Sequence, residues 1–197
     1  MRNKSMSKKE ATHQRMLDSI HKDFRQHGYD GTGVDGLAKN AGVTSGAFYS
    51  HFGSKAKAFQ EVVAEGVQQF TNAVEYYQQE YGEHWLEEFT NFYLGEKRTC
   101  DLSESCALQS LTVEVSRHNK ETRSVFEGEL TNAAHTFNKG MNSMDNDSAT
   151  SEAWVTIAML IGGATLARAV NDPELAETIV HSIKSAVNKK AKCNQET

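Results

Sequence analysis

The chain has 197 residues, 17 of them aromatic, which is enough for a sizeable core in one or two small domains. Average proline usage of about 5% predicts roughly ten prolines, whereas the chain has one, so little in it stops a helix. With 14 glycines, three cysteines and 38% hydrophobic residues, the composition excludes collagen-like, disulfide-framework and disordered classes.

The net charge of −5 hides an asymmetry along the chain. Residues 1–57 carry ten Lys and Arg against five Asp and Glu, a net +5, whereas residues 58–197 carry eleven against twenty-one, a net −10. A basic end joined to an acidic body indicates that the N-terminal end meets a polyanion.

No targeting or membrane segment is expected. Residues 1–10 lack the apolar run of a signal peptide. The most hydrophobic stretch, 153–167, is shorter than the roughly 18–20 residues that cross a bilayer, which favours a buried helix. Cys100, Cys106 and Cys193 have no disulfide-framework spacing, so we expect a reduced, cytoplasmic protein.

Apolar residues recur at helical spacing along nearly the whole chain, and no segment alternates strictly, which predicts an all-α fold of about nine helices. Pro173 after Asp172 is a strong helix start, and residues 141–148 are polar and predict a loop. The expected helices cover residues 9–27, 34–40, a short stretch after Thr44 up to Phe52, 54–81, 83–95, 103–117, 120–141, 149–170 and 173–190.

Three helices followed by a much longer one indicate a small domain at residues 1–53 joined to a helical body at 54–197. Within the small domain, Ala38 precedes Gly42 by four residues. A small residue lets a second helix pack across the first, and the turn between them favours a left-handed glycine. With Val43 and Phe48 as anchors of the second helix, residues 34–52 predict a helix-turn-helix, although a plain surface hairpin of two helices shares the Ala38–Gly42 pattern.

The second helix of this motif is expected to turn small or polar side chains outward. Small residues let a helix sit deep in a DNA major groove, and hydroxyls donate to phosphates. Lys55, in the first turn of the next helix, is placed to clamp a phosphate together with backbone N–H groups. The residues predicted to face outward are Thr44, Ser45, Gly46, Ala47, Tyr49 and Ser50.

Residues 15–59 resemble the tetracycline-repressor (TetR) family of bacterial transcription regulators. The match is carried by Phe24, Gly28, Tyr29, Thr32, Val34, Leu37, Ala38, Ala41, Gly42, Val43, Thr44, Gly46, Phe48, Tyr49, His51, Phe52, Ser54 and Lys55. The resemblance implies a homodimer on a palindromic double-stranded DNA operator, with a helical body that binds a small-molecule effector. It also implies that Thr44, Ser45, Gly46, Ala47 and Tyr49 lie on DNA, with His51, Lys55 and Thr32 near the DNA backbone.

Three positions depart from the family pattern. Gly33 and Gly36 replace the usual Ser or Thr cap and the acid three residues later, which removes a capping box worth a few tenths to about 1 kcal/mol. Ser45 replaces a common long side chain, so direct base reading is expected to be sparse. Lys57 replaces a frequent acid, which weakens a second capping box and adds positive charge.

A pattern of a different class lies in the same region. Gly31, Gly33 and Gly36 satisfy G-x-G-x-x-G, the dinucleotide fingerprint. The preceding residues 21–30 are polar and helical rather than a buried strand, and lysines stand where the ribose-binding acid is expected. We therefore expect no cofactor.

Aromatic residues gather in the body between residues 70 and 93, with Tyr77, Tyr81, Trp85 and Phe89 four residues apart. Such a stripe is either core or one wall of a small-molecule pocket. The family resemblance places effector pockets among these middle helices. The hypothesis is a pocket that includes Trp85, Phe89, Phe92, Gln109, Phe126 and Trp154.

Cys106 has two possible positions in the helix predicted near residue 103. It lies in the second turn if Asp101 caps, or in the first turn if Ser103 caps, where a helix N-terminus lowers the pKa of a thiol. Some electrophile- and oxidant-sensing family members have a cysteine at a similar position, so Cys106 joins the candidate effector site. The alternative is a buried structural cysteine.

The last two helices are predicted to form the dimer interface. The helix at 149–170 is apolar on more than one face, and the helix at 173–190 has one apolar stripe. Two such helices from each subunit would make a four-helix interface, whereas packing within one subunit is the alternative. The candidate interface residues are Leu160, Gly163, Leu166, Ile179, Ile183 and Val187.

No motif for enzyme chemistry or a metal site is present in the sequence, and the eight histidines are scattered. The sequence therefore predicts a dimeric regulator, most often a repressor in this family, released by a small molecule or by an electrophile or oxidant. The alternatives are an architectural DNA-binding protein without an effector, and a helical-bundle enzyme using the glycine-rich segment.

Overall fold

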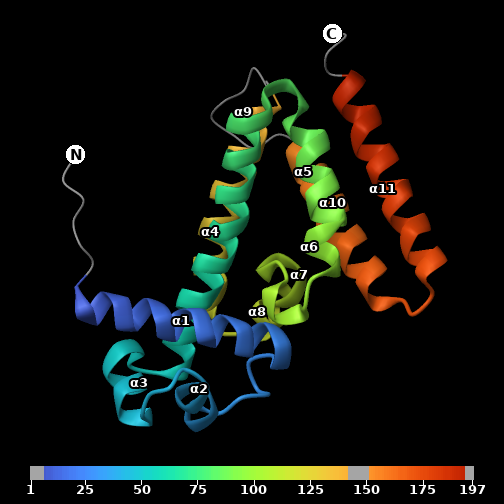
Figure 1. Cartoon of the computed structure of the whole chain (residues 1–197). Coiled ribbons are helices and arrows are strands. Elements are labelled where there is room, and N and C mark those ends of the chain that lie inside the picture. The colour runs from blue at the N-terminus through green and yellow to red at the C-terminus, as the bar shows by residue number, and fades with distance from the viewer. Residues whose placement is uncertain (1–6, 142–150, 194–197) are drawn as a thin grey trace.

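The computed structural model describes residues 7–141 and 151–193, and every regular element in those ranges is a helix (Figure 1). The all-α prediction is confirmed. The N-terminal elements are α1 (Lys8–His27), α2 (Val34–Asn40), α3 (Ser45–Phe52) and the long α4 (Lys55–Tyr81). The body continues with η1 (Gly82–His84), α5 (Trp85–Leu94), α6 (Glu96–Thr99), η2 (Leu102–Glu104), α7 (Ala107–Ser110), α8 (Thr112–Arg117), α9 (Lys120–Gly140), α10 (Ser151–Ala169) and α11 (Pro173–Cys193).

Local sequence explains where the first helices begin and end. The Ser7 side chain accepts from the Glu10 N–H while the Glu10 carboxylate accepts from the Ser7 N–H, a capping box that starts α1 one residue earlier than predicted. Gly28 ends α1 with a φ of 72°. The α4 helix begins after Ser54, whose hydroxyl accepts from the Lys57 N–H at 3.1 Å.

The prediction of one helix over residues 103–117 is wrong. In its place lie the 3₁₀ turn η2, the four-residue α7 and the short α8, with extended backbone at Ser105 and Cys106. Asp101 accepts from the Ser103 N–H and so caps the turn η2, not an α-helix. The break lets α7 tuck between α1 and α4, a tertiary contact that the periodicity of one segment cannot reveal.

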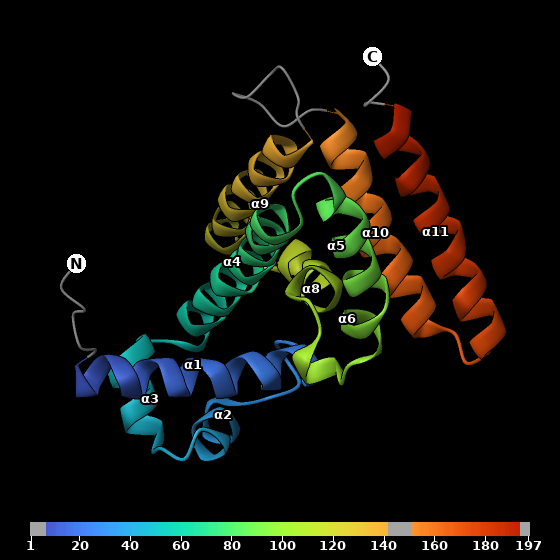
Figure 2. The same ribbon diagram turned by 45° about the horizontal axis from the view of Figure 1, so that its top comes forward.

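Two hydrophobic cores hold the molecule together. In the N-terminal head, α1, α2 and α3 pack around Met16, Phe24, Leu37 and Phe48 on the first turns of α4. In the body, α4 lies along α9 while α5, α10 and α11 complete the bundle (Figure 2). Its core is rich in aromatic side chains that touch edge to face, a favoured geometry.

The hydrophobic stretch at 153–167 lies within α10, in line with the expected buried helix. None of the helices in the described ranges has both the length and the apolar character needed to cross a membrane. The loop predicted over residues 141–148 lies, apart from Met141, outside the described residues.

Candidate nucleic-acid interface and body cavity

The turn between α2 and α3 has the geometry that a helix-turn-helix requires. Gly42 adopts a φ of +69°, a region that side chains other than glycine rarely enter. The Val43 N–H donates to the Ala38 carbonyl at 2.9 Å, which ties the turn to the end of α2. Thr44 caps α3 by accepting from the Ala47 N–H at 3.2 Å. Buried Phe48 then fixes which face of α3 is turned inward.

The outward face of α3 carries the residues predicted to meet DNA. Thr44, Gly46, Tyr49 and Ser50 are exposed, with half of the Tyr49 surface open at 52%. Ser45 and Ala47 are half-buried. A Cβ built on Gly46 would meet only the Thr44 hydroxyl, at 3.8 Å, so the helix surface there is open. This open surface would let the backbone of α3 approach the major groove of DNA closely.

Asp35 is a residue of this surface that the sequence reasoning missed. The Ser45 hydroxyl donates to the Asp35 carboxylate at 2.5 Å, so in this structure it is engaged within the head. Thr32 sits at the start of the motif with its hydroxyl buried and without a hydrogen-bond partner in the described structure. As expected from the glycine at 33, α2 begins without a side-chain cap.

Basic side chains flank α3. The Lys55 ammonium lies 4.3 Å above the ring of Tyr29, a cation–π contact that holds it at the start of α4. Lys57 is exposed two residues further along α4, and Lys39 is exposed at the end of α2. His51 is half-buried with its ring 5.5 Å from that of His13. Lys55 and the first N–H groups of α4 together form a suitable site for a phosphate.

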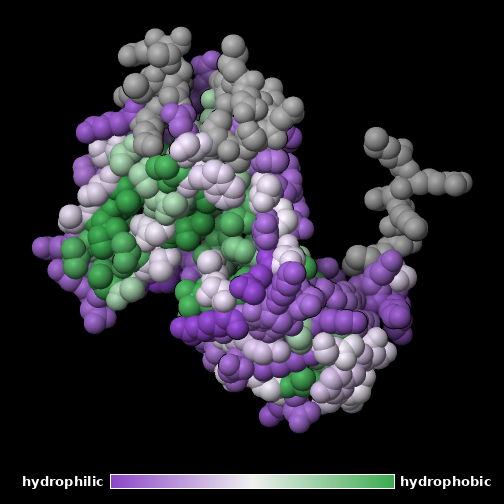
Figure 3. All heavy atoms as spheres, turned by 180° about the vertical axis from the view of Figure 1, so that it is seen from behind, coloured by the Kyte–Doolittle hydropathy of each residue, from purple (hydrophilic) through white to green (hydrophobic). Residues whose placement is uncertain are grey.

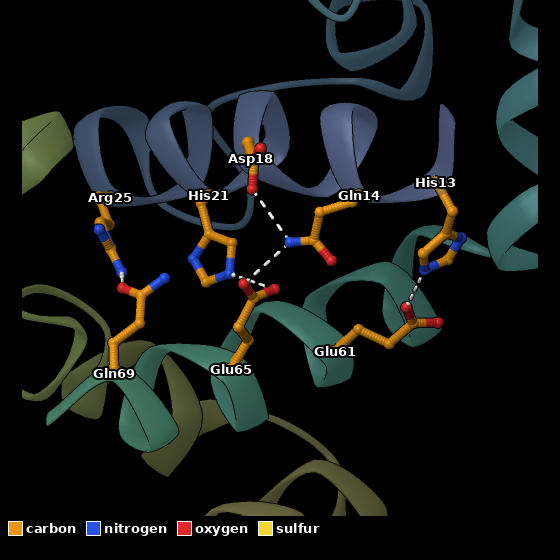
Figure 4. Close-up of polar contacts among 8 residues, drawn as sticks. All are labelled: His13, Gln14, Asp18, His21, Arg25, Glu61, Glu65 and Gln69. Carbon is orange, nitrogen blue, oxygen red and sulfur yellow. Dashed lines mark hydrogen bonds and ion pairs between the residues drawn. The ribbon is translucent and has the colours of Figure 1, made fainter. Parts of the chain in front are cut away.

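A polar network joins α1 to α4 (Figure 4). The contacts run in register along both helices: His13 to Glu61 at 2.7 Å, Gln14 and His21 to Glu65 at 3.0 and 3.3 Å, and Arg25 to Gln69 at 2.8 Å. The hydrogen bond from His21 holds the pKa of the Glu65 carboxyl below its ordinary value of 4.5. Since α4 runs on into the body, this network couples the head to the body.

The head also touches the body through η2 and α7. Lys22 of α1 pairs with the Glu104 carboxylate at 2.7 Å, and the Glu104 backbone carbonyl accepts from Lys97. Beside this pair, Gly66 allows α7 to approach α4 so closely that a Cβ at Gly66 would clash with Ala107. A shift of η2 or α7 would therefore also move their contacts with α1.

The body contains a cavity of about 110 Å³ between α4, α5 and α7. Three of the residues predicted for an effector site, Phe89, Phe92 and Cys106, line it. The remaining lining residues, which sequence reasoning missed, are Gly66, Gln69, Phe70, Ala73, Tyr93 and Lys97. The aromatic spacing pointed to α5, but only the fold brings α4 and α7 to the same place.

The other four residues predicted for the effector site do not line this cavity. Trp85 is buried and its indole N–H donates to the Gly140 carbonyl at 2.7 Å, which ties α5 to the end of α9. Phe126 packs against both cores, and Trp154 is 38% exposed on α10. Gln109 lies beside Tyr93, and both of its amide atoms are buried without a hydrogen-bond partner in the described structure.

Cys106 matches neither position foreseen for it. It is the residue before α7, with extended backbone, and its side chain is 6% exposed. It therefore lies outside any helix, and α7 itself has only four residues. Its sulfur faces the cavity and neighbours the Tyr93 hydroxyl, an arrangement that fits the alternative of a buried cysteine.

The candidate dimer residues fall into two groups. Leu160 and Val187 are fully buried within the protomer, and a Cβ at Gly163 would clash with Ile183, so these residues hold α10 against α11. Leu166 is 62% exposed. Hydrophobic side chains gather on the side of the molecule where α10 and α11 lie (Figure 3). The large exposed hydrophobic residues of these two helices are Trp154, Val155, Leu166 and Leu175.

Comparison with known proteins shows which proteins the helix-turn-helix region is similar to. The model for the family described as bacterial regulatory proteins, tetR family, matches residues 17–62. The transcriptional regulator SrpR of Pseudomonas putida is 38% identical over 64 residues, which is 32% of this chain and 30% of SrpR. AcrR of Shigella flexneri is 39% identical over 62 residues, 32% of this chain and 29% of AcrR. The chain thus matches less than a third of the length of these two relatives.

Solved structures extend the likeness to the body. A TetR-family regulator from Cytophaga hutchinsonii superposes with a TM-score of 0.73 at 20% identity, covering 94% of this chain and 98% of that one. The reduced form of E. coli NemR gives a TM-score of 0.73 at 20% identity, covering 89% and 96%. At such identity the likeness of the body is one of fold.

Proposed function

We propose that the chain is a member of the TetR family of bacterial regulatory proteins and acts as a cytoplasmic, dimeric transcriptional repressor. Its head, residues 1–53, binds a palindromic DNA operator through α3. Its body, residues 54–197, holds the dimer together and carries the site of a small-molecule effector.

The exposed face of α3 is the observation that carries this proposal. It combines an open surface at Gly46, an exposed Tyr49 and flanking lysines at 39 and 55, next to an acidic body. A protein that reads DNA needs such a positive, closely fitting head, and the negative body keeps other faces away from phosphates. The Ser45 hydroxyl, which donates to Asp35 of α2 at the exposed surface of the head, can contact DNA only if it turns away from that carboxylate.

The dimer rests on the apolar face of α10 and α11. Leu166 and Leu175 are about half exposed, at 62% and 47%, on helices whose other sides pack inside the protomer. The same patch on a second copy would cover them, which gives a two-fold interface of four helices. We therefore centre the interface on Leu166 and the outer side of Ile179, with Leu160, Gly163, Ile183 and Val187 supporting it from within.

Release from DNA occurs when the effector shifts the dimer from the population whose head spacing fits the operator to one whose spacing does not. Two heads match successive major grooves only when they are about 34 Å apart, one turn of DNA. An effector that binds better to a body with another head spacing draws the protein away from the operator. The α4 helix and the polar network on α1 transmit the change.

Selection of DNA fragments from a random pool by the purified full-length protein tests this function. We expect one palindromic sequence to be enriched, with half-sites about 10 base pairs apart, and a Tyr49→Ala variant to lose selection while remaining folded. Binding of all fragments alike would favour the alternative of an architectural protein, and absence of binding at low salt would refute DNA binding altogether.

A further inference from the structure

We propose that the body cavity binds a single-ring aromatic carboxylate, with the ring among phenylalanines and the carboxylate at the end of the cavity nearest the head. This inference rests on the proposed function, since it names the chemical class of the effector. It is carried by the uneven chemistry of the cavity wall, which is aromatic at one end and cationic at the other.

The end of the cavity farther from the head is apolar. Phe70, Phe89 and Phe92 line it together with Ala73. The ring centroids of Phe70 and Phe89 lie 5.6 Å apart in an edge-to-face arrangement, and Tyr77 stacks on Phe92 from behind. Aromatic walls of this kind accept another flat ring through offset or edge-to-face contacts.

The end of the cavity nearer the head is polar and positively charged. Gln69, Lys97 and Cys106 lie there, and Tyr93 turns its hydroxyl toward Cys106 and Gln109. That hydroxyl is on a residue only 2% exposed and makes no hydrogen bond of ordinary geometry within the described structure. Burial raises the pKa of Tyr93 well above its usual value, so the group stays a neutral O–H donor. Such a buried, unused donor is costly unless a ligand oxygen accepts from it.

The sign of the charge selects an anion. None of the nine lining residues is acidic, and Lys97 is the one lining residue with a full charge. Arg25 lies behind Gln69, is 7% exposed and has no carboxylate within 4.0 Å among the described residues. The neighbouring carboxylates of Glu65 and Glu104 are engaged by His21 and Lys22. Buried positive charge without a direct partner favours an anion from outside.

The volume sets the size of the ligand. An apolar cavity of about 150 Å³ holds benzene in another protein. The cavity here is smaller, at about 110 Å³, but half-exposed Lys97 and exposed Gln69 lie on its wall, so one ring can enter only with its carboxylate left at this edge. Two fused rings would exceed this space without rearrangement.

The carboxylate would also reach the contact between body and head. Lys97 donates to the Glu104 carbonyl, and the Glu104 carboxylate holds Lys22 of α1. A ligand carboxylate competes with that carbonyl for Lys97, because a charged acceptor is the stronger partner. The turn η2 is then free to shift against α1, which links this ligand class to release from DNA.

Isothermal titration of the full-length protein with benzoate, and with benzamide as the uncharged molecule of the same shape, tests the proposal. We expect benzoate to bind about tenfold or more tightly than benzamide. Lys97→Met should remove that preference, whereas Lys139→Met, at an exposed lysine of α9, should preserve it. Ala73→Leu fills the apolar end and should abolish binding of both compounds while the unfolding transition remains cooperative.

Equal affinity for benzoate and benzamide, benzoate binding that survives Ala73→Leu, or no binding of either compound would overturn the proposal. DNA binding measured in the same samples separates this from the fate of the proposed function. A protein that selects an operator but ignores benzoate retains the function and loses the ligand class. A protein that binds benzoate through Lys97 but no DNA loses the function and retains the ligand class.

Discussion

Replacing Gly66 by alanine tests the contact between α4 and α7, through which the body meets the head. In the middle of a helix, Gly→Ala alone stabilises by about 0.5–1 kcal/mol. At Gly66 the added Cβ would lie closer than 3.0 Å to the Cβ of Ala107, a separation that real Cβ atoms essentially never show. Because the Ala107 Cβ is fixed to the backbone of α7, the helices themselves must separate. Overpacking of this kind costs about 1–3 kcal/mol.

Gly128 provides the matched control. It lies inside α9, and a Cβ there meets nothing within 4 Å. The helix-propensity gain is common to both variants, so the difference between Gly66→Ala and Gly128→Ala isolates the packing cost, about 1–3 kcal/mol in favour of Gly128→Ala. Urea unfolding at one protein concentration measures it, since the stability of a dimer depends on concentration. Equal stabilisation by both substitutions would refute the close approach of α4 and α7.

Three further outcomes are expected. Lys55→Met should weaken operator binding for all sequences alike and lower the slope of log affinity against log salt by about one, and an unchanged slope would remove Lys55 from the phosphate contacts. The lowered pKa of Glu65 contributes stability that is present above about pH 4.5 and is lost as pH falls through the folded-state pKa. In urea titrations, the wild type should therefore lose more stability on acidification than Glu65→Gln. An identical dependence of unfolding free energy on pH in the two proteins would contradict the His21 contact. Leu166→Glu should produce monomers in sedimentation velocity while Val113→Glu, at a residue equally exposed on α8, should not; a dimer in both variants would move the interface elsewhere.

Local signals in the sequence are enough to predict the head. Serine and threonine caps and glycine stops set the ends of α1, α3 and α4 within a residue, because capping is decided by neighbours in the chain. The outward face of α3 follows from buried Phe48 in the same way. The Asp35–Ser45 contact was missed because it depends on how α2 crosses α3.

The body is harder to predict, because its details arise from contacts distant in sequence. The segment at 103–117 has the apolar spacing of one helix, yet it folds as short pieces, one of which packs Ala107 against Gly66 of α4. The cavity joins residues of α4, α5 and α6 with Cys106, the residue before α7, and its polar end depends on Lys97 and Tyr93, which have no local motif. Apolar spacing on α10 and α11 likewise cannot tell the inward Leu160 from the outward Leu166.

The most direct test of the role of α3 is the operator affinity of Gly46→Glu compared with Gly128→Glu. Both glycines lie on open helix surfaces, so neither glutamate should disturb the fold. If α3 enters the groove, the carboxylate at position 46 meets phosphates, and like charges so placed cost several kcal/mol, a loss of about 100-fold or more in affinity. Gly128→Glu should bind as wild type does. Equal affinity of the two variants in a fluorescence anisotropy titration would contradict the placement of α3 in the major groove.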